Sequence, residues 1–115
     1  MREKIRDKQR LEHILGALDT IISFRQKYTD EEIISNPITF FGFVKHLEII
    51  GVAAYKLTKE FKLNHNEVNW IEIEGMRHLM VHGYYLIESN IVISTLREDT
   101  DILRQYITKF LSEDI

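Results

Sequence analysis

The stretch LEHILGALDTII, residues 11–22, places its large apolar side chains three and four positions apart. This spacing puts the side chains on one face of an α-helix, whereas a strand requires a spacing of two. Charged residues occupy the opposite face, so we expect a helix from about Glu3 to Lys27 that packs along one side only. The apolar positions of that face are Leu11, Ile14, Leu15, Leu18, Ile21 and Ile22.

Two capping signals follow this helix. Thr29 precedes Glu32 by three residues, the spacing of a capping box, which predicts a short extra helical turn. Asn36 and Pro37 then combine a preferred N-cap with the residue favoured at the first helical position. We therefore expect a second long helix from Pro37 to about Phe61.

The second helix contains small residues that allow a neighbouring helix to approach closely. A glycine in a helix costs about 1 kcal/mol relative to alanine, so its presence there needs a reason. We interpret the small positions as packing contacts rather than as a functional site. They are Gly42, Gly51, Ala53 and Ala54.

Two more helices follow in the sequence. A polar link leads to a third helix, expected from about Glu67 to Gly83, and Ser89 or Asn90 caps a fourth. Four long helices with short links predict an all-α fold, an antiparallel four-helix bundle with one short extra helical turn. We expect residues 1–115 to form it as a single domain.

Composition limits the environment in which the chain works. Its 115 residues include no cysteine, which excludes disulfides, thiolate metal sites and a thiol nucleophile. The start, MREKIRDKQR, lacks the apolar segment of a secretory signal, so we expect a cytoplasmic protein. The most apolar stretch, residues 38–57, is interrupted by charged side chains and falls short of the roughly 18 uncharged residues that span a bilayer. We expect no membrane association.

The net charge of −3 argues against a protein that grips nucleic acid through a broad basic surface. It leaves room for a local basic cleft, because such a cleft can focus positive potential even on an acidic protein. The net charge therefore does not exclude RNA as a substrate.

The segment RHLMVHGY, residues 77–84, carries the candidate chemistry in the pattern Arg77-x4-His82-x-Tyr84. Arginine offers a planar, permanently charged fork that matches phosphate oxygens and stabilises the charge that develops when a phosphodiester is attacked. Histidine can give and take protons near neutral pH, as attack by a ribose 2′-hydroxyl requires. Neither step needs a metal or another cofactor.

On one ideal helix, His82 lies roughly 140° around the axis from Arg77. The two side chains then cannot reach the same atom. We expect the site to form either where the helix ends near Gly83 or, preferably, in a cleft between two copies of this helix in a dimer.

The pattern Trp70-x6-Arg77-x4-His82-x-Tyr84, together with the preceding HLEIIGVAA of residues 46–54, resembles the HepT branch of the HEPN superfamily. The resemblance extends over nearly the whole chain. It implies a homodimeric, metal-independent endoribonuclease that acts as the toxin of a toxin–antitoxin pair. The partner it implies is a minimal nucleotidyltransferase, MntA.

The same resemblance implies roles for single residues. Arg77 and His82 would be catalytic, and His78 would fill the polar position that often follows the arginine. Tyr84 would be the residue that the antitoxin adenylylates, which adds bulk and phosphate charge beside the cleft. The family often has Gly-Glu-Ala in the second helix, whereas this chain has Val52 at the position of the glutamate.

Other interpretations stay open. The chain could be a non-catalytic helical module that binds a nucleotide or a nucleotidyltransferase, as the valine at position 52 suggests. His78 and His82 have a zinc-binding spacing but need a third ligand such as His46, His65 or Glu74, so we disfavour a metal site. Arg77 and Tyr84 could simply stack on the surface, and Tyr85 could be a second modified residue. Trp70, Met76 and Met80 are interpreted as core or dimer interface.

Overall fold

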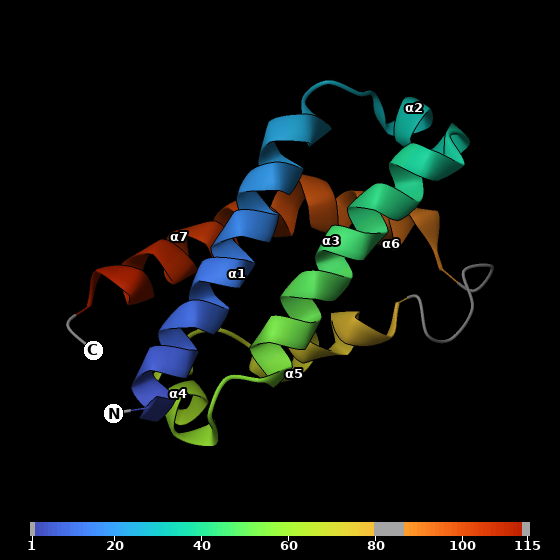
Figure 1. The fold of residues 1–115 in the computed structure, drawn as a ribbon. Coiled ribbons are helices and arrows are strands. Elements are labelled where there is room, and N and C mark those ends of the chain that lie inside the picture. The colour runs from blue at the N-terminus through green and yellow to red at the C-terminus, as the bar shows by residue number, and fades with distance from the viewer. Residues whose placement is uncertain (1, 80–86, 114–115) are drawn as a thin grey trace.

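The computed structural model describes residues 2–79 and 87–113, and every regular element within them is helical. Figure 1 shows the arrangement of these elements. In chain order they are α1 (Arg2–Arg25), α2 (Asp30–Ser35), α3 (Pro37–Tyr55), α4 (Lys59–Asn64), α5 (Trp70–Gly75), the 3₁₀ helix η1 (Met76–His78), α6 (Ser89–Ser94), the π-helical turn η3 (Thr95–Asp99) and α7 (Thr100–Ser112).

Four helical columns form the bundle. α1 and α3 lie side by side and run in opposite directions, and α7 packs against α1 (Figure 1). α5 and η1 pack on α3, while α6, η3 and α7 follow one another as the last column. The predicted all-α four-helix bundle is confirmed, with α2 as the short extra turn.

The stripe predicted for the first helix lies at the centre of the core. Four of its six members are completely buried, while Leu15 and Ile22 at its edge are only partly covered. Burying a side chain of this size contributes about 1.5–3 kcal/mol, so these contacts hold α1 between its neighbours. The largest completely buried side chains are Leu11, Ile14, Leu18 and Ile21 of α1, Ile33 of α2, Val44, Leu47 and Ile50 of α3, and Leu96, Ile107 and Phe110 of the last column.

Both capping signals act as predicted. The hydroxyl of Thr29 accepts a hydrogen bond from the backbone N–H of Glu32 (3.1 Å), and the Glu32 carboxylate accepts one from the N–H of Thr29 (2.9 Å). The side-chain oxygen of Asn36 accepts from the N–H groups of Ile38 and Thr39 at the start of α3. These bonds satisfy backbone donors that have no partner within the helix.

The second helix is shorter than predicted because a new cap interrupts the chain after Tyr55. The hydroxyl of Thr58 accepts from the N–H of Phe61 (3.1 Å) and starts α4. The buried carboxylate of Asp7 in turn accepts from the N–H of Thr58 (2.9 Å) and from its hydroxyl (2.7 Å). A residue 51 positions earlier thus fixes this break, and the expectation of one helix to Phe61 is wrong.

The third and fourth helices begin close to the expected residues. α5 starts at Trp70 with Asn69 as its cap, three positions later than expected. The expectation that this helix continues to Gly83 is wrong, because α5 ends at Gly75 and the chain passes into the 3₁₀ turn η1. Gly83 itself lies outside the described residues.

α6 starts at Ser89 with Glu88 at the N-cap position and no side-chain capping bond, so the prediction that Ser89 or Asn90 caps it is wrong. The sequence did not predict the turn η3. Its π-helical backbone is wider than an α-helix, and it lies where an arginine of α1 reaches the last column.

That arginine is Arg25, which is buried at the end of α1. Its guanidinium donates to the carbonyl of Leu96 (2.6 Å), to the hydroxyl of Thr100 (2.7 Å) and to the carboxylate of Asp101 (2.8 Å). Arg97 of η3 reaches back and donates to the backbone carbonyl of Arg25 (2.8 Å). Two arginines therefore join the end of α1 to η3 and α7.

α3 is long and apolar enough to cross a membrane by length and composition alone. Half of the window that passes this test is buried inside the protein. Because α3 packs against α1, α2, α5 and η1, its apolar side chains cover the interior of the bundle. It is a partly buried core helix of a compact protein.

We predict that Arg25→Met lowers the free energy of unfolding by about 2–4 kcal/mol, because it leaves buried oxygen acceptors without their donor. The matched control is Arg104→Met, since Arg104 forms an exposed pair with Asp19 (2.6 Å) and should cost at most about 1 kcal/mol. Urea unfolding of both variants measures the difference. Equal losses in the two variants would show that the buried position of Arg25 has no special importance.

Candidate functional site

Arg77 lies in η1, where the chain presses directly against α3. Gly51 of α3 makes this approach possible because it has no side chain. A methyl group there would overlap the backbone nitrogen of Arg77 and lie 2.8 Å from the carbonyl carbon of Met76, closer than real Cβ atoms come. Gly51 is therefore a packing contact as predicted. The same prediction is wrong for Gly42, which is exposed and where a methyl group would meet nothing within 4 Å.

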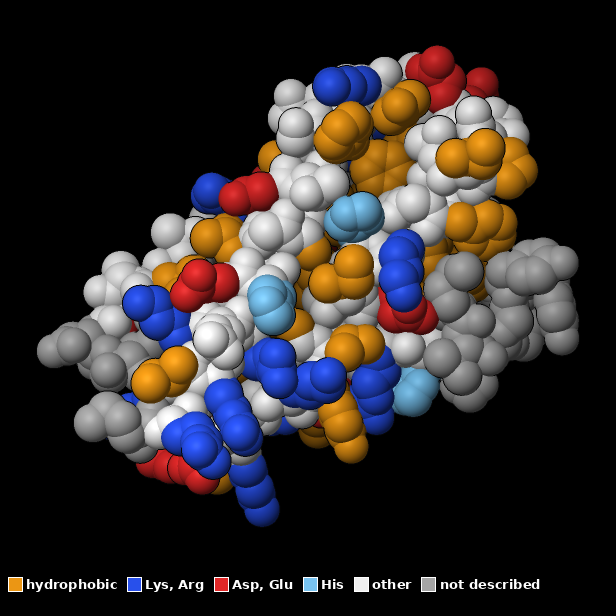
Figure 2. Space-filling view, in the orientation of Figure 1, with side chains coloured by type: hydrophobic (Ala, Val, Ile, Leu, Met, Phe, Trp, Pro, Cys, Tyr) orange, Lys and Arg blue, Asp and Glu red, His pale blue; other side chains and the backbone are white. Residues whose placement is uncertain are grey.

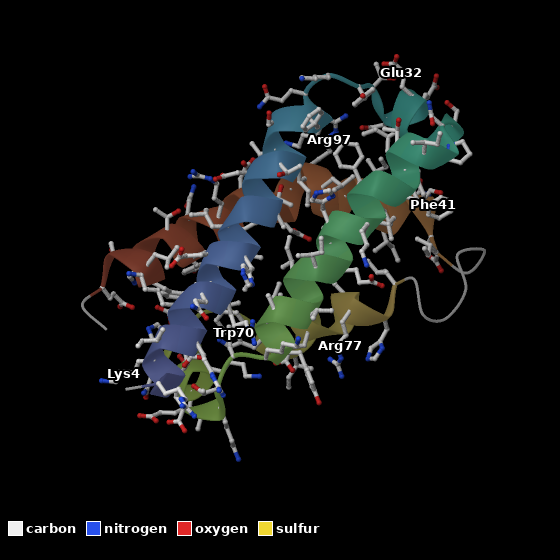
Figure 3. The ribbon with its side chains drawn as sticks, in the orientation of Figure 1. Lys4, Glu32, Phe41, Trp70, Arg77 and Arg97 are labelled. Atoms are coloured by element: carbon white, nitrogen blue, oxygen red, sulfur yellow. The ribbon has the colours of Figure 1, made fainter. Side chains whose placement is uncertain are left out.

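The side chain of Arg77 is held at two points. Its guanidinium carbon lies 4.0 Å from the centre of the Tyr55 ring, a cation–π contact, and its Nη1 donates to the carbonyl of Glu74 (3.0 Å). Figure 3 shows Arg77 beside the end of α3. Arg77 is only partly buried, and a guanidinium has five N–H donors in all. Donors therefore remain for a phosphate.

Tyr55 was not foreseen as the partner of Arg77. It lies four residues after Gly51, on the same face of α3, so the glycine that admits η1 and the ring that receives Arg77 form one contact surface. The only signal in the sequence is this spacing from a helical glycine to an aromatic residue. This spacing is common in helices, so it does not predict a contact with Arg77 unless the packing of η1 on α3 is known.

The 3₁₀ turn changes the geometry assumed for the motif. Successive residues of a 3₁₀ helix are about 120° apart rather than about 100°, so the directions expected from an ideal α-helix do not apply to Arg77 and His78. His78 is exposed at the end of η1. His82, Tyr84 and Tyr85 lie outside the described residues, and the convergence of Arg77 with His82 stays a prediction.

The histidines considered as further metal ligands have other contacts. The Nδ1 of His46 lies 2.8 Å from the carbonyl of Gly42. His65 stacks on Phe61 at 3.9 Å, and its Nε2 lies 2.8 Å from the Glu113 carboxylate. In residues 2–79 and 87–113 no three histidine, aspartate or glutamate side chains are grouped so that they could hold a metal ion.

Trp70 is buried, as predicted for a core residue, and Met76 is partly buried against the core. The indole Nε1 of Trp70 donates to the carbonyl of His65 (2.9 Å). Its ring also lies beside those of Phe61 and Phe110. Trp70 therefore closes one end of the bundle and offers no stacking platform for a base. Met80 lies outside the described residues.

A basic groove of about 240 Å³ lies between α1 and α3. Figure 2 shows lysine, arginine and histidine side chains gathered over this part of the two helices. Glu48 is the one carboxylate among its described lining residues, and its Oε1 lies 2.8 Å from the ammonium of Lys45. The groove is lined by Arg10, His13, Lys45, Glu48, Ile49, Val52, Ala53 and Lys56.

A larger hollow of about 440 Å³ lies between α5–η1 and the last column, and its lining is mainly apolar. Its charged members are Glu67, Glu72 and Asp99, and no lysine or arginine is among its described lining residues. A hydrogen bond from its own backbone N–H lowers the pKa of the Glu67 carboxyl, and Lys109 adds to this shift. The negative charge disfavours a phosphate there, so the basic groove is the better place for one.

Comparison with known proteins gives a consistent picture. A family model described as ribonuclease HepT-like matches residues 14–110. A protein of Caldanaerobacter subterraneus subsp. tengcongensis, named as a candidate RNase, is 33% identical over 104 residues, which cover 90% of this chain and 93% of that protein. The "Probable ribonuclease HepT" of Thermococcus cleftensis is 31% identical over 97 residues, 84% of this chain and 88% of its own. No solved structure matches the chain.

We predict that Gly51→Ala lowers the free energy of unfolding by about 1–3 kcal/mol, because the new methyl group forces η1 away from α3. Gly42→Ala is the matched control on the same helix. With no atom nearby, it should raise stability by up to about 1 kcal/mol through helix propensity. Thermal and urea unfolding compare the two. If Gly51→Ala is as stable as Gly42→Ala, the close approach of η1 to α3 is refuted.

Proposed function

The chain belongs to the HepT-like ribonuclease family, and from this membership we propose that it is a metal-independent endoribonuclease, the toxin of a toxin–antitoxin pair in the cytoplasm. The observation that carries the proposal is the placement of Arg77. Its backbone is fixed against Gly51, and its guanidinium rests on Tyr55 at a partly exposed position. A charged fork held in this way suits a phosphate better than a mobile surface arginine would.

The proposed reaction is cleavage of RNA by its own ribose. The imidazole of His82 takes the proton of a 2′-hydroxyl, whose oxygen attacks the adjacent phosphorus, and the bond from phosphorus to the 5′-oxygen breaks. The leaving oxygen receives a proton from an imidazolium. The products are a 2′,3′-cyclic phosphate and a 5′-hydroxyl. Arg77 stabilises the negative charge that develops on the phosphate, and His78 is the additional polar group beside it.

We assign the site to a homodimer. Arg77 of one protomer would face His82 of its partner, so that each dimer holds two equivalent sites related by the symmetry axis. This arrangement removes the need for one short segment to turn both side chains toward the same phosphate. The exposed Tyr55 ring beneath Arg77 offers further apolar area for such a contact.

Regulation in this proposal acts on Tyr84. A minimal nucleotidyltransferase of the MntA type would attach AMP to its hydroxyl, with pyrophosphate leaving from ATP. The added phosphate charge and bulk would stand two residues from His82, where the RNA phosphate must bind. Modified protein would therefore no longer cleave RNA.

We predict that Arg77→Ala and His82→Ala each reduce RNA cleavage by about 10²-fold or more. Arg77→Lys should recover only part of the loss, because an ammonium lacks the planar fork. The assay follows a labelled single-stranded RNA with EDTA present, and Arg104→Ala, on the surface of α7, serves as the control. Unchanged cleavage by either alanine variant of the motif would refute the assigned site.

For the regulatory step we expect a mass increase of one or more AMP units after coexpression with the cognate nucleotidyltransferase. Tyr84→Phe should abolish the increase because it removes the accepting hydroxyl. Tyr85→Phe, one residue away, is the matched control and should still gain the full mass. Loss of the modification in Tyr85→Phe, with retention in Tyr84→Phe, would move the site to the neighbouring tyrosine.

A second candidate function is a module that binds the nucleotidyltransferase without cutting RNA. Val52 favours it, since it stands where the family often has glutamate and lies on the groove next to the Arg77 contact. Tight binding of the partner, with no cleavage of any RNA by the unmodified dimer, would establish this function in place of the nuclease.

A further inference from the structure

The basic groove stands out against the charge of the whole protein. The chain has a net charge of −3, so cations gathered at one place are not a consequence of overall composition. Three lysine or arginine side chains line the groove, together with His13 and a single carboxylate. The larger hollow, between α5–η1 and the last column, has acidic groups in its lining instead. The two faces therefore differ in sign.

Ion pairing distinguishes two cations of the groove from the arginines that join helices. Arg25, Arg97 and Arg104 join helices through ion pairs with aspartates. In the described part of the chain, Arg10 and Lys56 form no ion pair. Their charges are not used to hold the bundle together and are available to a ligand. Lys45 already neutralises Glu48, so the carboxylate adds little repulsion.

The groove adjoins the position of Arg77. Little more than one turn of α3 joins the two. Gly51 contacts the backbone of Arg77, and the Tyr55 ring stacks against the Arg77 guanidinium. Val52, between them in the sequence, lines the groove. Lys56 follows Tyr55 directly at the end of the same helix. Cations therefore lie on both sides of Val52, with an uncharged side chain between them.

We propose that the groove between α1 and α3 binds the phosphate backbone of single-stranded RNA and leads it to Arg77. The inference rests on the proposed function and names where its substrate lies. Arg10 and Lys56 would contact phosphates flanking the one that Arg77 holds. The partly exposed aliphatic residues Ile49 and Val52 form a floor that leaves these cations poorly screened by water.

The test measures binding without cleavage. The probe is a fluorescent single-stranded RNA with 2′-O-methyl riboses, which keeps every phosphate but lacks the attacking hydroxyl. Fluorescence anisotropy across a range of salt concentrations gives the dissociation constant and its salt dependence. Each phosphate contact removed should reduce the slope of log K against log salt by about 0.7 for a single strand.

The groove variant is Arg10→Gln with Lys56→Gln, and each single variant is measured as well. The double variant should bind roughly tenfold more weakly at low salt, and the slope of log K against log salt should fall by about 1.4. In each single variant the slope should fall by about 0.7. The matched control is Lys8→Gln with Lys27→Gln. Both lysines are exposed, and Lys8 lies roughly 200° around α1 from Arg10, so the net charge changes equally outside the groove.

Binding that weakens in the groove variants and stays within twofold in the control supports the proposal. Unchanged binding by the groove variants overturns it, as does an equal loss in the control or no binding by the wild type. The result is separable from the nuclease assignment. Normal binding by the groove variants together with inactive Arg77→Ala rejects the groove alone, whereas groove-dependent binding without any cleavage by the wild type rejects the nuclease alone.

Discussion

The approach of η1 to α3 at Gly51 is the contact on which the candidate site depends. With no side chain at this position, the backbone of Met76 and Arg77 lies directly on the helix. Tyr55, one turn later, then receives the guanidinium, and Glu74 accepts one of its hydrogen bonds. A larger residue at position 51 would displace the backbone and the side chain together, so the glycine positions Arg77 without touching any ligand.

The arginines of this protein divide by the partners they have. At the end of α1, Arg25 and Arg97 satisfy backbone and side-chain oxygens of two elements and hold the first and last columns together. In the groove between α1 and α3, Lys45 pairs with Glu48, whereas Arg10 and Lys56 form no ion pair within the described residues and are left to solvent or to a ligand. Stability and binding therefore draw on different charges, which allows the binding face to change with little cost to the bundle.

Local patterns predicted much of the fold, and distant contacts account for what they missed. The stripe of the first helix and the caps at Thr29 and Asn36 are short-range signals, and the structure confirms them. The break after Tyr55 depends on Asp7, and the turn η3 accompanies the insertion of Arg25. Neither partner is visible in the local sequence. For the site, the motif identified Arg77, but its support by Gly51 and Tyr55, and the groove shared by two helices, required the packed bundle.

In the proposed homodimer, Arg77 of one protomer holds a phosphate, and His82 of its partner assists the attack of the ribose 2′-hydroxyl on that phosphate. Mixing Arg77→Ala protein with His82→Ala protein under conditions that exchange protomers tests this arrangement directly, because a mixed dimer contains one site with both groups intact. RNA cleavage should return to roughly a quarter of the wild-type rate at equal amounts, since half of the dimers are mixed and each has one site in place of two. A mixture that exchanges protomers and stays as inactive as its parts would contradict the account.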